Sequence, residues 1–81
     1  MANSSAAEKR RIKLDRLVDI EGYDSLDDLI AATVSDSVSP AICLNVGCDY
    51  TAEMEPDQDR GWCEVCGTNT VASALILAGI I

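Results

Sequence analysis

The pattern of apolar and polar positions predicts a helix over residues 6–20. Leu14, Leu17 and Val18 fall on one stripe of this segment, whereas its charged side chains lie elsewhere around the axis. Gly22 follows at the position where a glycine commonly caps the C-terminus of a helix. The first predicted element is therefore a helix with one apolar face.

A second helix is predicted to begin after Ser25. Ser25 is a typical N-cap, and Asp28 three positions later makes this a variant of the capping box. Side chains spaced as one buried helical face follow: Leu26, Leu29, Ile30, Thr33 and Val34. The polar residues and proline of segment 35–40 predict a linker after this helix.

The next segment has the features of a β-hairpin. Residues 50–54 alternate weakly and contain β-formers, residues 55–61 are rich in turn formers, and Trp62 begins a return strand. Gly47 and Gly67 lie in the flanking turns, where a positive φ is often required. We therefore expect residues 50–54 to pair with the strand at Trp62, between two cysteine-containing turns.

Residues 71–78 are apolar almost all round and predict a C-terminal helix. Thr70 is its expected N-cap and Gly79 lies near its end. A helix of this kind needs cover on most of its faces. Either the two N-terminal helices cover it, or a second copy of the chain does so in a symmetric dimer.

These elements predict a small α+β protein of one domain. A chain of 81 residues buries a small core, which favours an additional cross-link such as a bound metal or disulfides. We expect a disordered tail over residues 1–7, a helical N-terminal segment over residues 8–40, and a four-cysteine module with the C-terminal helix over residues 41–81. The last two are expected to fold as one cooperative domain.

Four cysteines could provide this cross-link, and the chain has no histidine. Cys43 and Cys48 form a C-x4-C pair, fourteen residues intervene, and Cys63 and Cys66 form a C-x2-C pair. Two such pairs can converge on one metal ion, and four thiolates make a closed structural zinc site. Disulfides and free thiols are the alternatives. The start of the chain shows no export signal, and no apolar run is long enough to span a bilayer, so a cytoplasmic protein is expected.

Residues 41–78 resemble zinc-ribbon and treble-clef modules, with Cys63-Glu64-Val65-Cys66-Gly67 as the most typical piece. In treble clefs a helix follows the second turn, as Thr70 onward is expected to do here. The first turn departs from the pattern, since four residues rather than two separate its cysteines. The whole chain is also similar to small proteins of proteobacteria and their phages, a resemblance that implies no activity.

The resemblance implies one structural zinc ion, and iron is the alternative. Turns of the form C-x2-C-G also occur in rubredoxins, and an iron site would make the protein an electron carrier. The spacing of the first cysteine pair and the absence of phenylalanine speak against iron. The colour of the purified protein distinguishes the two metals.

The distribution of charge narrows the choice of partner. Residues 1–16 have a net charge of +3, whereas residues 17–81 have a net charge of −11. So acidic a body repels phosphate and suits a basic protein partner. The basic residues of the first helix form a candidate nucleic-acid arm: Lys9, Arg10, Arg11, Lys13 and Arg16. The alternatives are a solvated helix face or pairing with the protein's own acids.

No enzyme is expected. Four cysteines leave a zinc ion no open position, and no histidine is present to act as a base. We read Glu53, Glu55 and Glu64 as solvated charges. The function expected is a zinc-stabilised, non-catalytic protein-interaction or regulatory module, with a nucleic-acid-binding regulator and a rubredoxin-like carrier as alternatives.

Four apolar residues are candidates for contact with a protein partner. Trp62 either packs on the hairpin and last helix to shield the metal or serves as a binding hot spot. Leu75, Ile76 and Ile80 belong to the apolar C-terminal segment, through which a homodimer would form.

Overall fold

A computed structural model describes residues 6–80 of the chain, and their side chains from residue 8 onward. The elements in order are α1 (Ala6–Glu21), α2 (Leu26–Val34), β1 (Ser39–Cys43), β2 (Thr51–Met54), β3 (Gly61–Cys63), β4 (Thr68–Ser73) and α3 (Ala74–Leu77). Residues 1–5 of the expected tail lie outside the described residues, and Ala6 and Ala7 already belong to α1. The fold is α+β, as expected.

The two N-terminal helices are confirmed, together with their caps. Gly22 has a φ of +80°, and the N–H of Tyr23 donates to the carbonyl of Val18 at 3.1 Å, which closes the C-terminus of α1. The Ser25 hydroxyl accepts from the N–H of Asp28 at 3.2 Å and caps α2.

The predicted buried face of α2 is too wide. Leu29 and Thr33 are buried, and Leu26 and Ile30 are partly buried. Val34, however, is 57% exposed. Val34 is the last residue of α2 and belongs to neither core cluster.

Four strands form one antiparallel sheet in the order β2-β1-β4-β3. The expected pairing of residues 50–54 with the strand at Trp62 is wrong, because β2 and β3 lie at opposite edges of this sheet. The central positions go instead to β1 and β4. Both are buried on both faces over part of their length, as their apolar runs allow.

Strand β1 begins at Ser39, so the last two residues of the predicted linker belong to it. Pro40 is tolerated in this central strand because β4 pairs with β1 only from Ala41 onward, where Ala41 faces Ser73. The nitrogen of Pro40 points toward the side where β4 has already ended, so no ladder hydrogen bond is lost there.

The expected C-terminal helix begins later than predicted. Val71 to Ser73 continue β4, and α3 starts at Ala74 with Ser73 as its N-cap, whose hydroxyl accepts from the N–H of Ile76 at 3.2 Å. A short continuous apolar run is compatible with a buried strand as well as a buried helix. Here β4 places Val71 and Ala72 on opposite faces, each inside a different core cluster.

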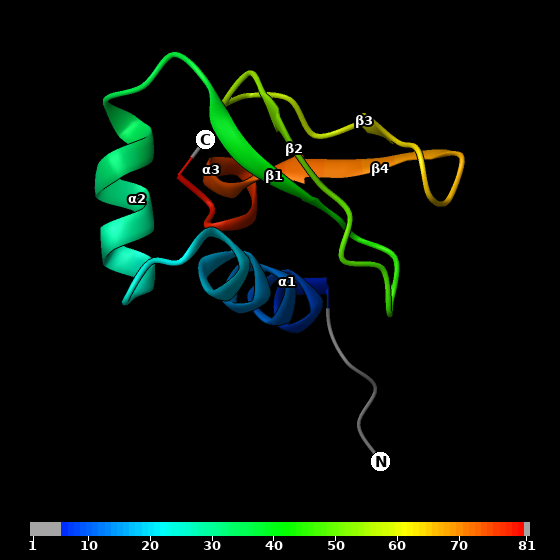
Figure 1. Cartoon of the computed structure of the whole chain (residues 1–81), viewed down its shortest axis with the longest axis horizontal. Coiled ribbons are helices and arrows are strands. Elements are labelled where there is room, and N and C mark those ends of the chain that lie inside the picture. Colours follow the sequence, from blue (N-terminus) through cyan, green and yellow to red (C-terminus); the bar gives the residue numbers. More distant parts are fainter. Residues whose placement is uncertain (1–5, 81) are drawn as a thin grey trace.

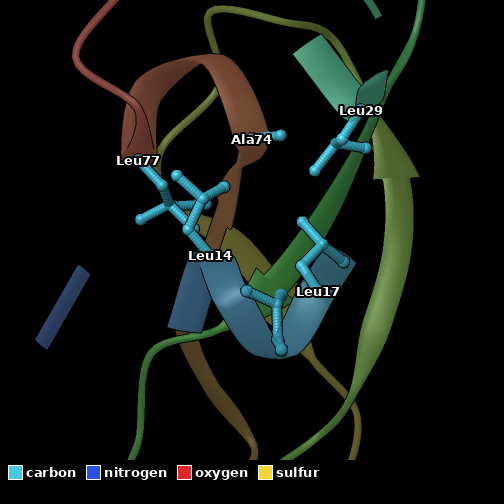
Figure 2. Packing of buried hydrophobic residues seen from close by; sticks show 7 residues of the cluster. Leu14, Leu17, Leu29, Ala74 and Leu77 are labelled. Carbon is cyan, nitrogen blue, oxygen red and sulfur yellow. The ribbon is translucent and has the colours of Figure 1, made fainter. Parts of the chain in front are cut away.

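The larger core lies between the helices and one face of the sheet. We call it the leucine core, and Figure 2 shows Leu14 and Leu17 of α1 directed toward Leu29 of α2 and Leu77 of α3. Its buried members are Leu14, Leu17, Leu29, Ile42, Ala72, Ala74 and Leu77. Helix α3 contacts both α1 and α2, so the two N-terminal helices provide its cover.

The sheet curls, so that its two edges approach each other on the face away from the helices. Met54 of edge strand β2 reaches Gly61 of edge strand β3, and a Cβ at Gly61 would meet its side chain. The turns that join β1 to β2 and β3 to β4 both lie at the end of the sheet remote from α2 (Figure 1). The Tyr50 hydroxyl donates to Glu64 across these two turns at 3.3 Å.

Candidate metal centre

Each cysteine pair is placed by the end of a strand and the turn that follows. Cys43 is the last residue of β1 and Cys48 lies in the turn before β2. Cys63 is the last residue of β3 and Cys66 lies in the turn before β4. The four Sγ atoms all lie within 4.8 Å of one another. The fold therefore brings together all four residues that the sequence suggested as metal ligands.

The distances between the sulfurs fit a tetrahedral ion site. Cys43 Sγ lies 3.9 Å from Cys66 Sγ, and Cys48 Sγ lies 3.7 Å from Cys63 Sγ. A zinc–sulfur bond of about 2.3 Å places tetrahedral sulfurs about 3.8 Å apart, whereas a disulfide brings them to about 2.05 Å. All four cysteines are free, so the arrangement is that of a ligand cluster rather than of two disulfides.

A turn N–H and a hydroxyl of strand β4 lie beside the sulfurs. The backbone N–H of Cys66 donates to Cys63 Sγ at 3.3 Å, and the Thr70 hydroxyl lies 3.1 Å from Cys43 Sγ. Gly47 and Gly67 have φ values of +82° and +69°, as expected for tight turns of this kind. Such hydrogen bonds stabilise sulfur in its charged form.

The thiols differ in how easily they ionise. Burial raises the pKa of the Cys43 thiol, but hydrogen bonds from Thr70 and the Asn45 backbone outweigh it, and the pKa falls to about 7. At Cys48 the Tyr50 backbone lowers the pKa, whereas burial and the three neighbouring cysteines raise it to about 12. Of these two thiols, that of Cys43 therefore ionises more easily than that of Cys48. A bound cation would supply the charge that lets several thiolates coexist.

Two basic residues of α1 hold the first cysteine turn. Pairing of the first helix with the protein's own acids was one of the alternatives expected from the sequence, whereas the contact of Lys13 with the Cys48 carbonyl was missed. The Lys13 ammonium donates to the carbonyl oxygen of Cys48 at 2.6 Å, and Arg16 pairs with Asp49 at 2.8 Å. Lys13 is only 8% exposed. Its place directly before Leu14 and four residues before Leu17, beside the apolar stripe, was the signal available in the sequence.

The five bases proposed as a nucleic-acid arm do not act as one free stripe. Arg11 pairs with Asp15 at 3.2 Å, and Arg16 pairs with Asp19 as well as with Asp49. Lys13 is buried against the cysteine turn. Only Lys9 and Arg10 are exposed without an ion pair to another residue of the described chain.

The candidate partner residues are distributed between surface and core. Trp62 is 55% exposed on edge strand β3. Leu75 is buried and Ile76 is partly buried against the leucine core, whereas Ile80 is exposed. Ile81 lies outside the described residues.

No helix in residues 6–80 combines the length and apolar character needed to cross a bilayer. Comparison of the chain with models of protein families, with curated proteins and with solved structures finds no match to any of them.

Proposed function

We propose that this protein is a non-catalytic interaction module whose fold is stabilised by one zinc ion held by four cysteines. The observation that carries the proposal is the convergence of four sulfurs within 4.8 Å, with separations suited to a tetrahedron. Two β-hairpins, each with a cysteine pair at its turn, favour a zinc-ribbon-like module. The four residues of α3 offer less support for a treble clef.

The donor set argues for structure rather than catalysis. Four thiolates complete the coordination of zinc and leave no position for water or substrate. Three of the four cysteines are buried, and only Cys66 is exposed. The ion is therefore a cross-link between two hairpins, which offsets the conformational entropy lost when the turns are ordered.

A basic segment of another protein is the partner that the exposed surface suits. Trp62 and Val65 are exposed on β3 and the turn after it, beside the metal centre. Residues 53–64 contain one base, Arg60, and five acids: Glu53, Glu55, Asp57, Asp59 and Glu64. An arginine or lysine of the partner could contact both these carboxylates and the face of the indole ring.

Metal analysis of the purified full-length chain tests the first half of the proposal. We expect one zinc ion per chain and a colourless protein. A coloured protein with one iron ion would replace the proposal with the electron-carrier alternative. A protein that binds neither metal would refute a metal-stabilised fold.

The partner can be tested by affinity capture with the zinc-loaded chain. We expect a basic protein to be retained by the wild type, released at high salt, and lost with Trp62→Ala. Val38→Ala is the matched control, because Val38 is also an exposed apolar residue but lies before β1. Equal capture by all three proteins would exclude the Trp62 surface.

A further inference from the structure

Lys13 stands apart from the other charged residues of the protein. Among residues 8–80 it is the only charged side chain that is buried. The other four bases of α1 are exposed. Removing an ammonium from water is costly unless compensating charge or hydrogen bonds lie close by. The position of Lys13 therefore requires a reason beyond the packing of α1.

The contacts of Lys13 point to the cysteine cluster. Its ammonium donates to the main-chain oxygen of Cys48 at 2.6 Å, across 35 positions of sequence. The neighbouring acid, Asp49, is half-exposed and already paired with Arg16 at 2.8 Å. A single carbonyl oxygen and a shared carboxylate are modest compensation for a buried ammonium.

A metal-loaded cluster would supply the missing charge. Four thiolates and one divalent ion have a net charge of −2, and in this protein that charge would be largely enclosed. Opposite charges attract far more strongly in such surroundings than in water. Lys13 and the loaded cluster would thus each lower the cost of burying the other.

We propose that Lys13 is a positioning residue of the metal centre, which compensates the charge of the metal–thiolate cluster and fixes the turn that presents Cys48. The proposal rests on the metal site proposed above. It links α1 to the metal: docking of the helix favours metal binding, and the bound metal favours docking of the helix. Partners of metal ligands commonly change metal affinity by about 10–100-fold when they are removed.

The test compares four variants of the full chain with the wild type. Lys13→Met and Lys13→Gln remove the charge at similar size, and Lys13→Arg retains it. Arg11→Met is the matched control, because it removes an exposed charge from the same helix. Zinc affinity is measured by competition with a chelator, and we expect a loss of about 10–100-fold for the two neutral variants only.

A second readout separates charge compensation from mere destabilisation of the fold. In the iron-substituted protein, four thiolates give a net charge of −1 with Fe3+ and −2 with Fe2+. Loss of a nearby positive charge therefore favours Fe3+ and lowers the reduction potential, by 59 mV for each tenfold change in relative affinity. We expect lower potentials for Lys13→Met and Lys13→Gln, and unchanged potentials for Lys13→Arg and Arg11→Met.

The outcomes distinguish this inference from the proposed function. If the neutral variants keep the wild-type potential, Lys13 has no electrostatic role at the metal, even if zinc affinity falls. If the wild type itself binds neither zinc nor iron, the metal site fails and the inference fails with it.

Discussion

The two faces of the central strands are stabilised by different means. On one face Ile42 and Ala72 join the leucine core beneath the three helices. On the other, Cys43 and Val71 join a smaller cluster that we call the cysteine core, whose buried members are Ala41, Cys43, Cys48, Cys63 and Val71. The leucine core has four leucines, whereas the cysteine core has one valine, one alanine and three thiols.

The difference explains why the proposed metal cross-link would be needed on one face of the sheet only. Burial of leucine side chains contributes about 1.5–3 kcal/mol each, which suits the helical face. The cysteine core buries little apolar area for two ordered turns. Because β1 and β4 belong to both cores, failure of the cysteine core should propagate into the helical face.

The largest expected effect is the removal of the metal. We expect complete chelation to unfold residues 41–70, because structural zinc can contribute on the order of 10 kcal/mol to a module of this kind. The helices should also lose protection, since Ile42 and Ala72 support the leucine core. Two-dimensional amide spectra before and after chelation measure this, with zinc addition as the control for reversibility. An unchanged spectrum of zinc-free protein would show that residues 41–70 are folded without a metal.

The next largest effect is expected from a cavity in the leucine core. Leu17 is fully buried, and Leu17→Ala should lower the free energy of unfolding of the metal-loaded protein by about 2–5 kcal/mol. Val34→Ala is the control, because Val34 is mostly exposed and its truncation should cost less than about 0.5 kcal/mol. Urea denaturation of the loaded protein provides both values. Equal effects at the two positions would mean that Leu17 is not part of a packed core.

A smaller effect should follow from adding a methyl group where the two edge strands of the sheet meet. A Cβ at Gly61 would meet the side chain of Met54 and lie 3.3 Å from Cβ of Val71. Gly61→Ala should therefore destabilise the loaded protein by about 1–3 kcal/mol. Met54→Ala makes room, so the double variant should lose less than the sum of the two single changes. Strict additivity in urea denaturation would show that the edges do not touch.

Local sequence signals predicted the features that depend on neighbouring residues. The caps at Gly22 and Ser25 and the convergence of the four cysteines depend on short-range turn chemistry or on spacing, and all were expected. The amphipathic stripe of Leu14 and Leu17 likewise identified part of the leucine core. The cap and stripe signals lie within a few residues of the element that they specify, whereas the cysteine spacing predicts a contact between two distant turns because a metal ion needs all four ligands.

Features that depend on distant pairing were not predictable in the same way. The apolar run at Val71 is compatible with a strand or a helix, and its pairing with β1 and β3 decides for a strand. Likewise, the turn formers before Trp62 indicate that a strand begins there, but they do not show which strand it pairs with. Lys13 was expected to be a solvated base, because nothing in the local sequence shows that its ammonium contacts the carbonyl of Cys48.

The smallest expected effect concerns the N-cap of α2, and it tests whether the two faces fold together. Ser25→Ala removes the acceptor for the N–H of Asp28 and should cost about 0.5–2 kcal/mol, whereas Ser25→Asp keeps an acceptor. If the metal-free chain is unfolded, zinc binding includes the free energy of folding. A loss of 1.4 kcal/mol at this cap should then lower the apparent zinc affinity tenfold, although α2 contributes no ligand.

Chelator competition measures the zinc affinity of both Ser25 variants. An affinity that does not change while urea denaturation shows the loss would mean that the leucine core and the cysteine core are independent.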